Sequence, residues 1–199
     1  MILNKFSVEK ATNALNFFVI KSGGEINKLK ALKLVYFADR YHLRKYGKLI
    51  TNDTYLAMKH GPVGSATKNI CEFSDYTDEF SIRYAGNFIE LKDEYTVHSK
   101  KEIDKSVLSK SDIEALNFAW KVYGAYDHFE LRDITHEYKE WIKASVRLTD
   151  DIKNTPMDIM DFLLDPNGEY NKCFELSAED KIDLREEIEE WNKIQAFWS

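Results

Sequence analysis

Apolar residues recur at helical spacing over residues 26–47, and this stretch predicts the central element of the fold. Asn27 can cap a helix that begins at Lys28, because its side-chain oxygen can accept hydrogen bonds from backbone N–H groups one turn on. Gly47 is a natural stop. One face of the helix is apolar and consists of Leu29, Leu32, Tyr36 and Leu43. A second apolar flank consists of Leu34, Val35, Ala38 and Tyr41. This pattern indicates that other helices enclose it.

A narrow edge of the same helix has a different character. Its residues recur in steps of three and four, so that four cations and one ring line up together. This edge, which we call the basic stripe, is Lys30, Lys33, Phe37, Arg40 and Arg44. It can be a solvated face whose long stems cover apolar surface, a contact surface for an acidic partner, or an internal contact with an acidic C-terminal helix. We predict that it binds a partner.

The neighbouring segments predict one helix before the central helix and a short strand after it. Ser7 can cap a first helix, which ends at Gly23-Gly24 and packs on the central one. Residues 50–58 contain β-forming residues, and His60-Gly61-Pro62-Val63 should break this strand as a rigid corner, because proline cannot continue a ladder. Ser65 then begins another helix.

Residues 80–98 change to a period of two. Three short alternating runs are separated by Gly86-Asn87 and Lys92-Asp93-Glu94, which is typical of a hairpin or meander. The runs are Phe80, Ile82 and Tyr84, then Phe88, Ile89 and Leu91, then Tyr95 and Val97. The predicted fold class is therefore α+β: a mainly helical single domain with a small antiparallel β element.

The remaining chain predicts further helices. One covers 113–123 after Ser109 or Ser111, a second covers 127–137, and a short third runs from Thr155-Pro156 to about residue 163. Ser177 can start a final helix. In that helix Ile182, Ile188 and Trp191 should face inward, and the acidic run Glu186, Glu187, Glu189 and Glu190 should face outward.

Composition describes a globular chain of one domain, or one domain with an appendage. It has 199 residues, of which 44% are hydrophobic and 14% aromatic, so it can bury a substantial core. We find neither a stretch long enough to cross a membrane nor a secretory signal pattern, so we expect no membrane association and a cytoplasmic location. Cys71 and Cys173 are far apart and lack metal-site spacing, which predicts two buried thiols.

Charge is distributed unevenly. Residues 1–70 contain 12 Lys/Arg and 4 Asp/Glu, whereas residues 71–199 contain 16 and 30, which gives net charges of +8 and −14. The acidic part would repel phosphate, and there is no glycine-rich phosphate loop, so direct DNA binding is not expected. An acidic protein partner, or internal neutralisation, fits the asymmetry better.

Candidate catalytic and metal-binding motifs are incomplete. His136-Glu137 resembles the start of a zinc-protease helix, but position 140 is Glu140 where a second histidine is needed. The other histidines have no ligand partner at a metal-site spacing, and no nucleophile motif surrounds a serine or cysteine. We expect no metal, no cofactor and no catalytic residue, although a site could assemble from distant residues.

The order and spacing of several pieces resemble the Panacea domain, a SocA-like antitoxin domain. These pieces are KALKLVYFAD at 30–39, Gly47, Ile50, Asp53-Thr54-Tyr55, Ala57, HGPV at 60–63, LRDITH at 131–136 and Trp141. The resemblance covers roughly residues 5–145. It implies a domain at 1–145 and leaves 146–199 as a helical extension that we expect to pack on it.

The resemblance implies an antitoxin, encoded by a bacterium or a prophage beside its toxin, that neutralises the toxin by direct contact. A second hypothesis is a proteolytic adaptor or chaperone-like binder of the toxin, and a third is an enzyme with a nonlocal site. The family pattern names neither the toxin nor the oligomeric state.

Most residues of the motif can also be explained by the fold. Tyr36 and Trp141 are expected as core aromatics, and Gly61, Pro62 and Val63 as a rigid corner. Asp39 and His136 are candidates for hydrogen bonds that fix the central helix against the β element.

Overall fold

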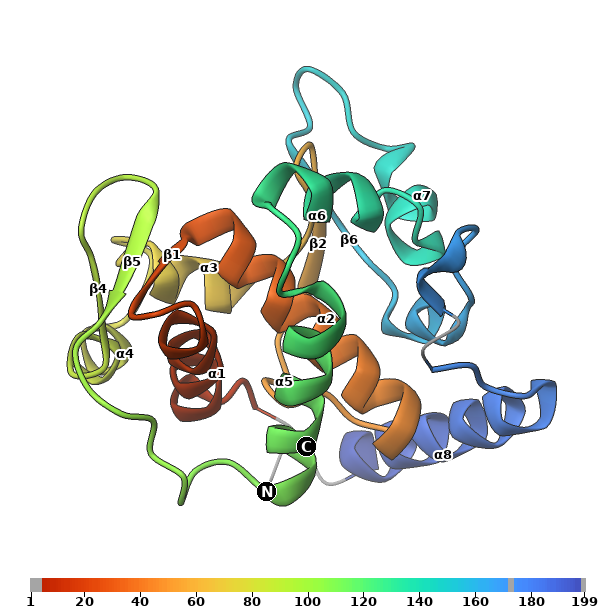
Figure 1. Ribbon diagram of the computed structural model, residues 1–199. Coiled ribbons are helices and arrows are strands. Elements are labelled where there is room, and N and C mark those ends of the chain that lie inside the picture. The colour runs from red at the N-terminus through yellow and green to blue at the C-terminus, as the bar shows by residue number, and fades with distance from the viewer. Residues whose placement is uncertain (1–4, 172–173, 198–199) are drawn as a thin grey trace.

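Helix α2 (Lys28–Tyr46) passes through the middle of the molecule and organises the other elements around it (Figure 1). The computed structural model describes residues 5–171 and 174–197. As predicted, the Asn27 side chain caps α2 by accepting from the N–H groups of Leu29 and Lys30, and Gly47 ends it in the left-handed conformation at φ 68°. Fourteen consecutive residues of α2 are buried, from Ala31 to Arg44, which confirms that α2 is enclosed.

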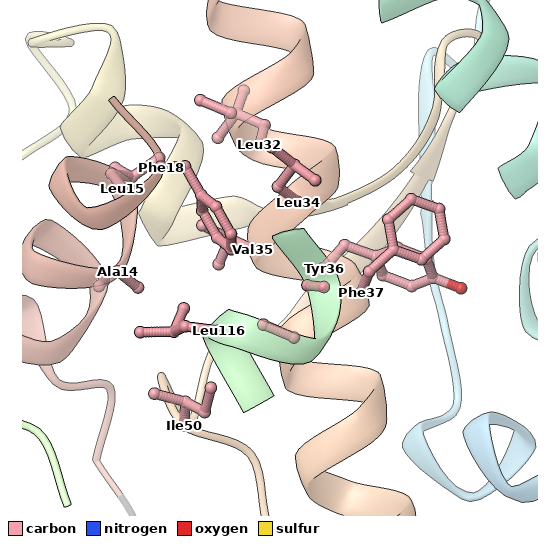
Figure 2. Packing of buried hydrophobic residues seen from close by; sticks show 14 of the residues in the cluster. Ala14, Leu15, Phe18, Leu32, Leu34, Val35, Tyr36, Phe37, Ile50 and Leu116 are labelled. Atoms are coloured by element: carbon pink, nitrogen blue, oxygen red, sulfur yellow. The ribbon is translucent and has the colours of Figure 1, made fainter. Parts of the chain in front are cut away.

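Helices α1 (Val8–Lys21), α3 (Ser65–Cys71) and α4 (Glu79–Gly86) pack together on one side of α2, and α5 (Lys110–Tyr123) lies on another. Ser7 caps α1, and Ser109 starts α5 with a capping box. Figure 2 shows Ala14, Leu15 and Phe18 of α1 facing Leu34 and Val35 of α2, with Leu116 of α5 and Ile50 beside them.

The later elements complete the fold. They are α6 (His128–Thr135), α7 (Lys139–Ser145), the short 3-10 helices η1 (Ile159–Leu163) and η2 (Glu169–Asn171), and α8 (Ala178–Phe197). The start of α8 is as predicted, because Ser177 and Asp180 exchange hydrogen bonds between their side chains and backbone N–H groups. No helix within the described residues combines the length and apolar character that a membrane crossing needs.

Two three-stranded antiparallel sheets flank the helices, so the α+β, mainly helical fold class is confirmed. One has the order β1-β5-β4, from β1 (Glu25–Asn27), β5 (Thr96–Ser99) and β4 (Ile89–Leu91). The other has the order β3-β2-β6, from β3 (Gly61–Gly64), β2 (Tyr55–Met58) and β6 (Asn154–Pro156). Residues 154–156 thus join the sheet of 55–64, while the division of the chain at residue 145 stays a prediction.

The predicted strand over residues 80–84 is wrong, because this segment is α4. The Asp78 side chain accepts from the N–H of Ser81 and caps the helix. The alternating residues Phe80, Ile82 and Tyr84 do not form the buried face of this helix. Phe80 is 61% exposed, whereas Ser81 and Ala85, one helical turn apart, are buried. The two later runs are correct and form β4 and β5, which pair as Ile89–Ser99, Glu90–His98 and Leu91–Val97.

Both proline predictions in the second sheet need correction. Gly61-Pro62 does not break the strand: the turn lies at Lys59-His60, and Pro62 pairs with Ala57 within β3. Thr155-Pro156 forms β6 rather than starting a helix, and η1 begins after Asp158. β3 and β6 are the two edge strands of this sheet, so no further strand lies on their outer sides. A proline, which lacks an N–H, is therefore tolerated in them.

Helix α8 lies across the C-terminal end of α2 and contacts the rest of the molecule along a narrow side (Figure 1). Ile188 is buried as predicted. Ile182 and Trp191, however, are 58% and 56% exposed, so the prediction that they face inward is wrong. Their positions on the helix differ from that of Ile188, and the narrow contact leaves them uncovered.

Candidate functional site

The basic stripe lies mostly inside the protein. Lys33, Phe37, Arg40 and Arg44 are between 1% and 6% exposed, so for these four the solvated-face interpretation is wrong. Lys30 is partly exposed and donates from Nζ to the Gly124 carbonyl over 2.8 Å. The stripe is buried because residues from α5 to η2 cover it: Phe37, for example, stacks on Tyr123 with ring centroids 3.8 Å apart.

Arg40 connects α2 to α7. Its Nε donates to Glu140 Oε1 over 2.7 Å, and the same oxygen accepts from the Tyr36 hydroxyl over 2.6 Å. The guanidinium also lies over the Tyr138 ring and donates to the Leu164 carbonyl. All of these side chains are buried, and burial together with the carboxylate beside it raises the pKa of Tyr36 well above its ordinary value.

Arg44 holds the C-terminal end of η1 and the two residues that follow it. One guanidinium nitrogen donates to the carbonyls of Phe162, Leu163 and Leu164, and the other donates to Asp165 Oδ1 over 2.8 Å. Lys181 of α8 forms an ion pair with the second oxygen of Asp165. The stripe therefore makes internal contacts, but its acidic partners are Glu140 and Asp165 rather than the acidic run of α8. Binding of a toxin by these five residues stays a prediction.

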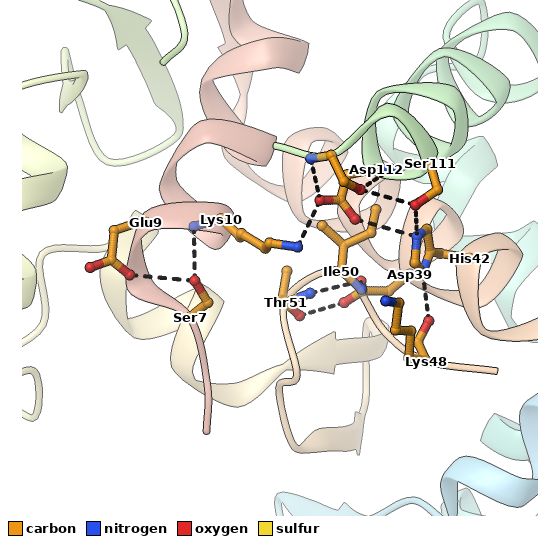
Figure 3. A network of polar contacts seen from close by, with 11 residues as sticks. Ser7, Glu9, Lys10, Asp39, His42, Lys48, Ile50, Thr51, Ser111 and Asp112 are labelled. Atoms are coloured by element: carbon orange, nitrogen blue, oxygen red, sulfur yellow. Dashed lines mark hydrogen bonds and ion pairs between the residues drawn. The ribbon is translucent and has the colours of Figure 1, made fainter. Parts of the chain in front are cut away.

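Asp39 fixes α2 against the loop that leads into β2, as predicted (Figure 3). Its carboxylate is fully buried and accepts from the N–H groups of Ile50 and Thr51, the Thr51 hydroxyl and the Tyr55 hydroxyl. Burial raises the pKa of Asp39 to about 6, although the four donors oppose this rise. Because all four neighbours donate, they favour the ionised form at neutral pH.

Gly61 makes room for Lys33. Its φ is +90°, and a Cβ placed there would lie 2.4 Å from Thr135 Oγ1 and 2.7 Å from Lys33 Nζ. Lys33 Nζ in turn donates to the Pro62 carbonyl over 2.6 Å. Burial holds the pKa of Lys33 well below its ordinary value. Gly61 and Pro62 of the motif thus accommodate and bind a buried lysine. The sequence analysis predicted them only as a rigid corner and did not predict this role.

His136 and Trp141 form a stacked pair, with ring centroids 3.8 Å apart. Trp141 Nε1 donates to the Met58 carbonyl over 3.1 Å, which joins α7 to β2. Trp141 is half-buried rather than a core residue. His136 does not make the predicted hydrogen bond: its Nε2 is buried and has no partner among the described residues. Burial and the nearby Lys33 both lower the pKa of His136.

A large groove opens beside these residues. Its volume is about 1120 Å³, and α2, α3, the β2–β3 turn, α6, α7 and the loop before β6 form its walls. Its apolar lining is Leu29, Leu32, Met58, Val63, Phe129, Trp141, Leu148 and Ile152, and its basic residues are Lys28, Lys33, Lys59, His60, Lys68, His128 and Lys153. The acidic side chains that line it are Glu72 and Asp150.

Sequence reasoning found Lys33, Gly61 and Trp141 but not the groove. Residues 128–129 and 148–153 carry no recognisable motif, and only the fold brings them next to β2 and β3. Glu140 and Asp165 were also missed as partners of the basic stripe, because their sequence separations from Arg40 and Arg44 follow no periodic pattern. Cys71 is buried as predicted, and Cys173 lies outside the described residues.

No group of three or more His, Cys, Asp or Glu side chains among residues 5–171 and 174–197 could hold a metal ion. The groove can instead offer apolar surface and positive charge to a partner.

Comparison with known proteins gives one match. The family model of the antitoxin SocA-like Panacea domain matches residues 32–142, which is more than half of the chain and includes the motif residues from Lys33 to Trp141. No curated protein and no solved structure matches the chain. The chain therefore belongs to the SocA-like antitoxin family that is defined by the Panacea domain.

Proposed function

We propose that this protein is the antitoxin of a toxin–antitoxin pair and that it neutralises its toxin by direct protein contact. Family membership carries the proposal, because the matching model describes an antitoxin domain and covers residues 32–142. The groove beside Lys33 supports it with a surface of the size and character that a protein segment can occupy. We expect the two proteins to meet in the cytoplasm.

The experiment uses the reading frame next to this gene. The neighbouring protein is expressed from an inducible promoter in a bacterial host, alone and together with this protein. We expect growth arrest with the neighbour alone, restored growth with both, and one co-eluting peak when the purified proteins are mixed. Restored growth without any physical complex would overturn the proposal of direct contact.

A proteolytic adaptor or chaperone-like binder is the second candidate, and the same strains distinguish it. If this protein neutralises the toxin by binding it directly, neutralisation should persist in a host that lacks its main cytoplasmic proteases, and the toxin level should be unchanged. An adaptor should lose neutralisation in that host, because the toxin would accumulate. An enzyme with a nonlocal site would neutralise without a stoichiometric complex and would leave a covalent change on the toxin or another molecule, which mass spectrometry detects.

A further inference from the structure

We propose that the groove holds an acidic segment of the toxin, whose apolar side chains pack on the groove walls and one of whose carboxylates reaches Lys33. This inference rests on the proposed function and names the surface and the chemistry through which it would work. Lys33, the charge of the rim, and the apolar residues at the opening each support it.

Lys33 is a buried lysine in the groove wall, and no acidic side chain of the described residues pairs with it. It is 1% exposed, and among the described residues its Nζ donates one hydrogen bond, to the Pro62 carbonyl, although an ammonium can donate three. No carboxylate of the described residues forms an ion pair with it, whereas the buried Arg40 and Arg44 each have one. Burying a charge without a partner is costly. A carboxylate supplied from outside would offset that cost and restore the charged form.

The rim of the groove is positive although the whole chain has a net charge of −6. Glu72, an acid of the lining, already pairs with Lys28 and Lys68 over 3.1 and 2.6 Å. Lys59 and Lys153 are exposed on the β2–β3 turn and the loop before β6, so they are free to face a partner. Complementary charge raises the association rate and fixes the orientation of a bound segment.

The apolar residues at the opening favour a protein over a nucleic acid. Phe129 is 52% exposed and Ile152 is 48% exposed, and both line the groove. Large apolar side chains left in water at the edge of a hollow are typical of a protein-binding site. The aliphatic residues of the walls, such as Leu29, Leu32 and Ile152, give a phosphate backbone no favourable contact. An acidic amphipathic segment satisfies both the walls and the rim.

The test measures the dissociation constant between full-length variants of this protein and the purified toxin encoded beside it, by calorimetry. Lys59→Glu combined with Lys153→Glu should weaken binding by about tenfold or more and flatten its salt dependence. The matched control is Lys105→Glu combined with Lys121→Glu, which makes the same charge change on exposed lysines outside the groove. The control should change the dissociation constant by less than about twofold.

Two single substitutions test the walls. Ile152→Asp should weaken binding by about tenfold or more, while Ile194→Asp, the same change on α8 at a similar exposure of 45%, should not. Lys33→Met retains the length of the side chain without its charge and should also weaken binding. Its melting temperature is measured alongside; if Lys33→Met does not fold, the exposed Lys59, Lys153 and Ile152 variants decide the question.

Each of the following results would overturn the inference. If the groove variants bind and neutralise the toxin as well as their controls do, the proposed function stands and the groove is not the site. If Ile194→Asp alone weakens binding, the exposed face of α8 is the site. If the wild-type protein fails to neutralise the toxin, the proposed function fails together with the inference. If a single-stranded RNA binds the wild-type protein with the same sensitivity to the rim variants and the toxin does not, the groove is a nucleic-acid site.

Discussion

Arg40 Nε donates to Glu140 Oε1 over 2.7 Å, and this buried contact holds α7 against α2. The two side chains are 7% and 0% exposed. Because both charges have left water, each depends on the other to offset its lost hydration. Tyr36 donates to the same carboxylate oxygen, so Glu140 satisfies two buried groups of α2 at once.

Glu140→Ala should lower the free energy of unfolding by about 3–5 kcal/mol, because it leaves a buried guanidinium without its partner. Urea unfolding followed by circular dichroism measures the change. Glu79→Ala is the control, since Glu79 pairs with Arg83 on the surface, with side chains 86% and 73% exposed. The control should cost less than about 1 kcal/mol. Equal losses in the two variants would show that Arg40 and Glu140 do not form a buried pair.

Asp39 should make stability depend on pH in the acid range. Its ordinary pKa is 3.8, and burial raises it to about 6 in the folded protein. Between these values the folded chain binds more protons than the unfolded chain, so the contribution of Asp39 is full below pH 3.8 and is lost as the pH rises through about 6. The change amounts to about 3 kcal/mol at most.

Asp39→Asn removes this titration and provides the comparison. The free energy of unfolding of the wild-type protein, minus that of the variant, should fall as the pH is raised from about 4 to about 7. Urea titrations at several pH values measure it. A difference that rises with pH would mean that the four donors outweigh burial and that the pKa of folded Asp39 lies below 3.8.

Trp141 should contribute less to stability than a core tryptophan. A fully buried ring would cost about 3–5 kcal/mol on truncation to alanine, and the half-buried position should reduce this. Trp141→Phe retains a ring on His136 but removes the bond to the Met58 carbonyl, so it should cost about 1 kcal/mol. Thermal melts of both variants test this order. A larger loss for the phenylalanine variant than for the alanine variant would contradict it.

Local signals in the sequence predicted the starts of four helices correctly. Ser7, Asn27, Ser109 and Ser177 all act as caps in the structure, because capping depends on residues within one turn of each other. The run of residues 80–84 was misassigned, since three alternating apolar residues are too few to distinguish a strand from a short helix. Asp78, which caps that helix, was the signal that could have corrected it.

Contacts between distant segments could not be predicted. The basic stripe has helical spacing, but whether water or protein covers it depends on residues from α5 to η2, which come much later in the chain. The groove is a similar case, because Lys33 and Gly61 belong to the motif while Ile152 and Lys153 come from a segment without one. Periodicity shows which residues share a face, and only tertiary packing decides what that face contacts.

The burial of Arg40 and Arg44 gives a definite expectation for reversing their charge. Arg40→Glu combined with Arg44→Glu should unfold the protein or lower its melting temperature strongly. Each glutamate would face acceptors that now bind a guanidinium, namely Glu140, Asp165 and the carbonyls of Phe162, Leu163 and Leu164. An unpaired buried charge costs about 3–5 kcal/mol, which is a large share of the stability of a domain.

Lysines at positions 186 and 190 should not rescue this double variant. Glu186 and Glu190 are exposed on α8 and do not contact the two arginines, so Glu186→Lys combined with Glu190→Lys leaves the new glutamates without a partner. Thermal melts and limited proteolysis of the double and quadruple variants measure the outcome. Recovery of the melting temperature in the quadruple variant would mean that α8 lies against the stripe in solution. Without recovery, any loss of toxin neutralisation in the double variant follows from unfolding, and only folded variants such as those of Lys59 and Lys153 can locate the binding surface.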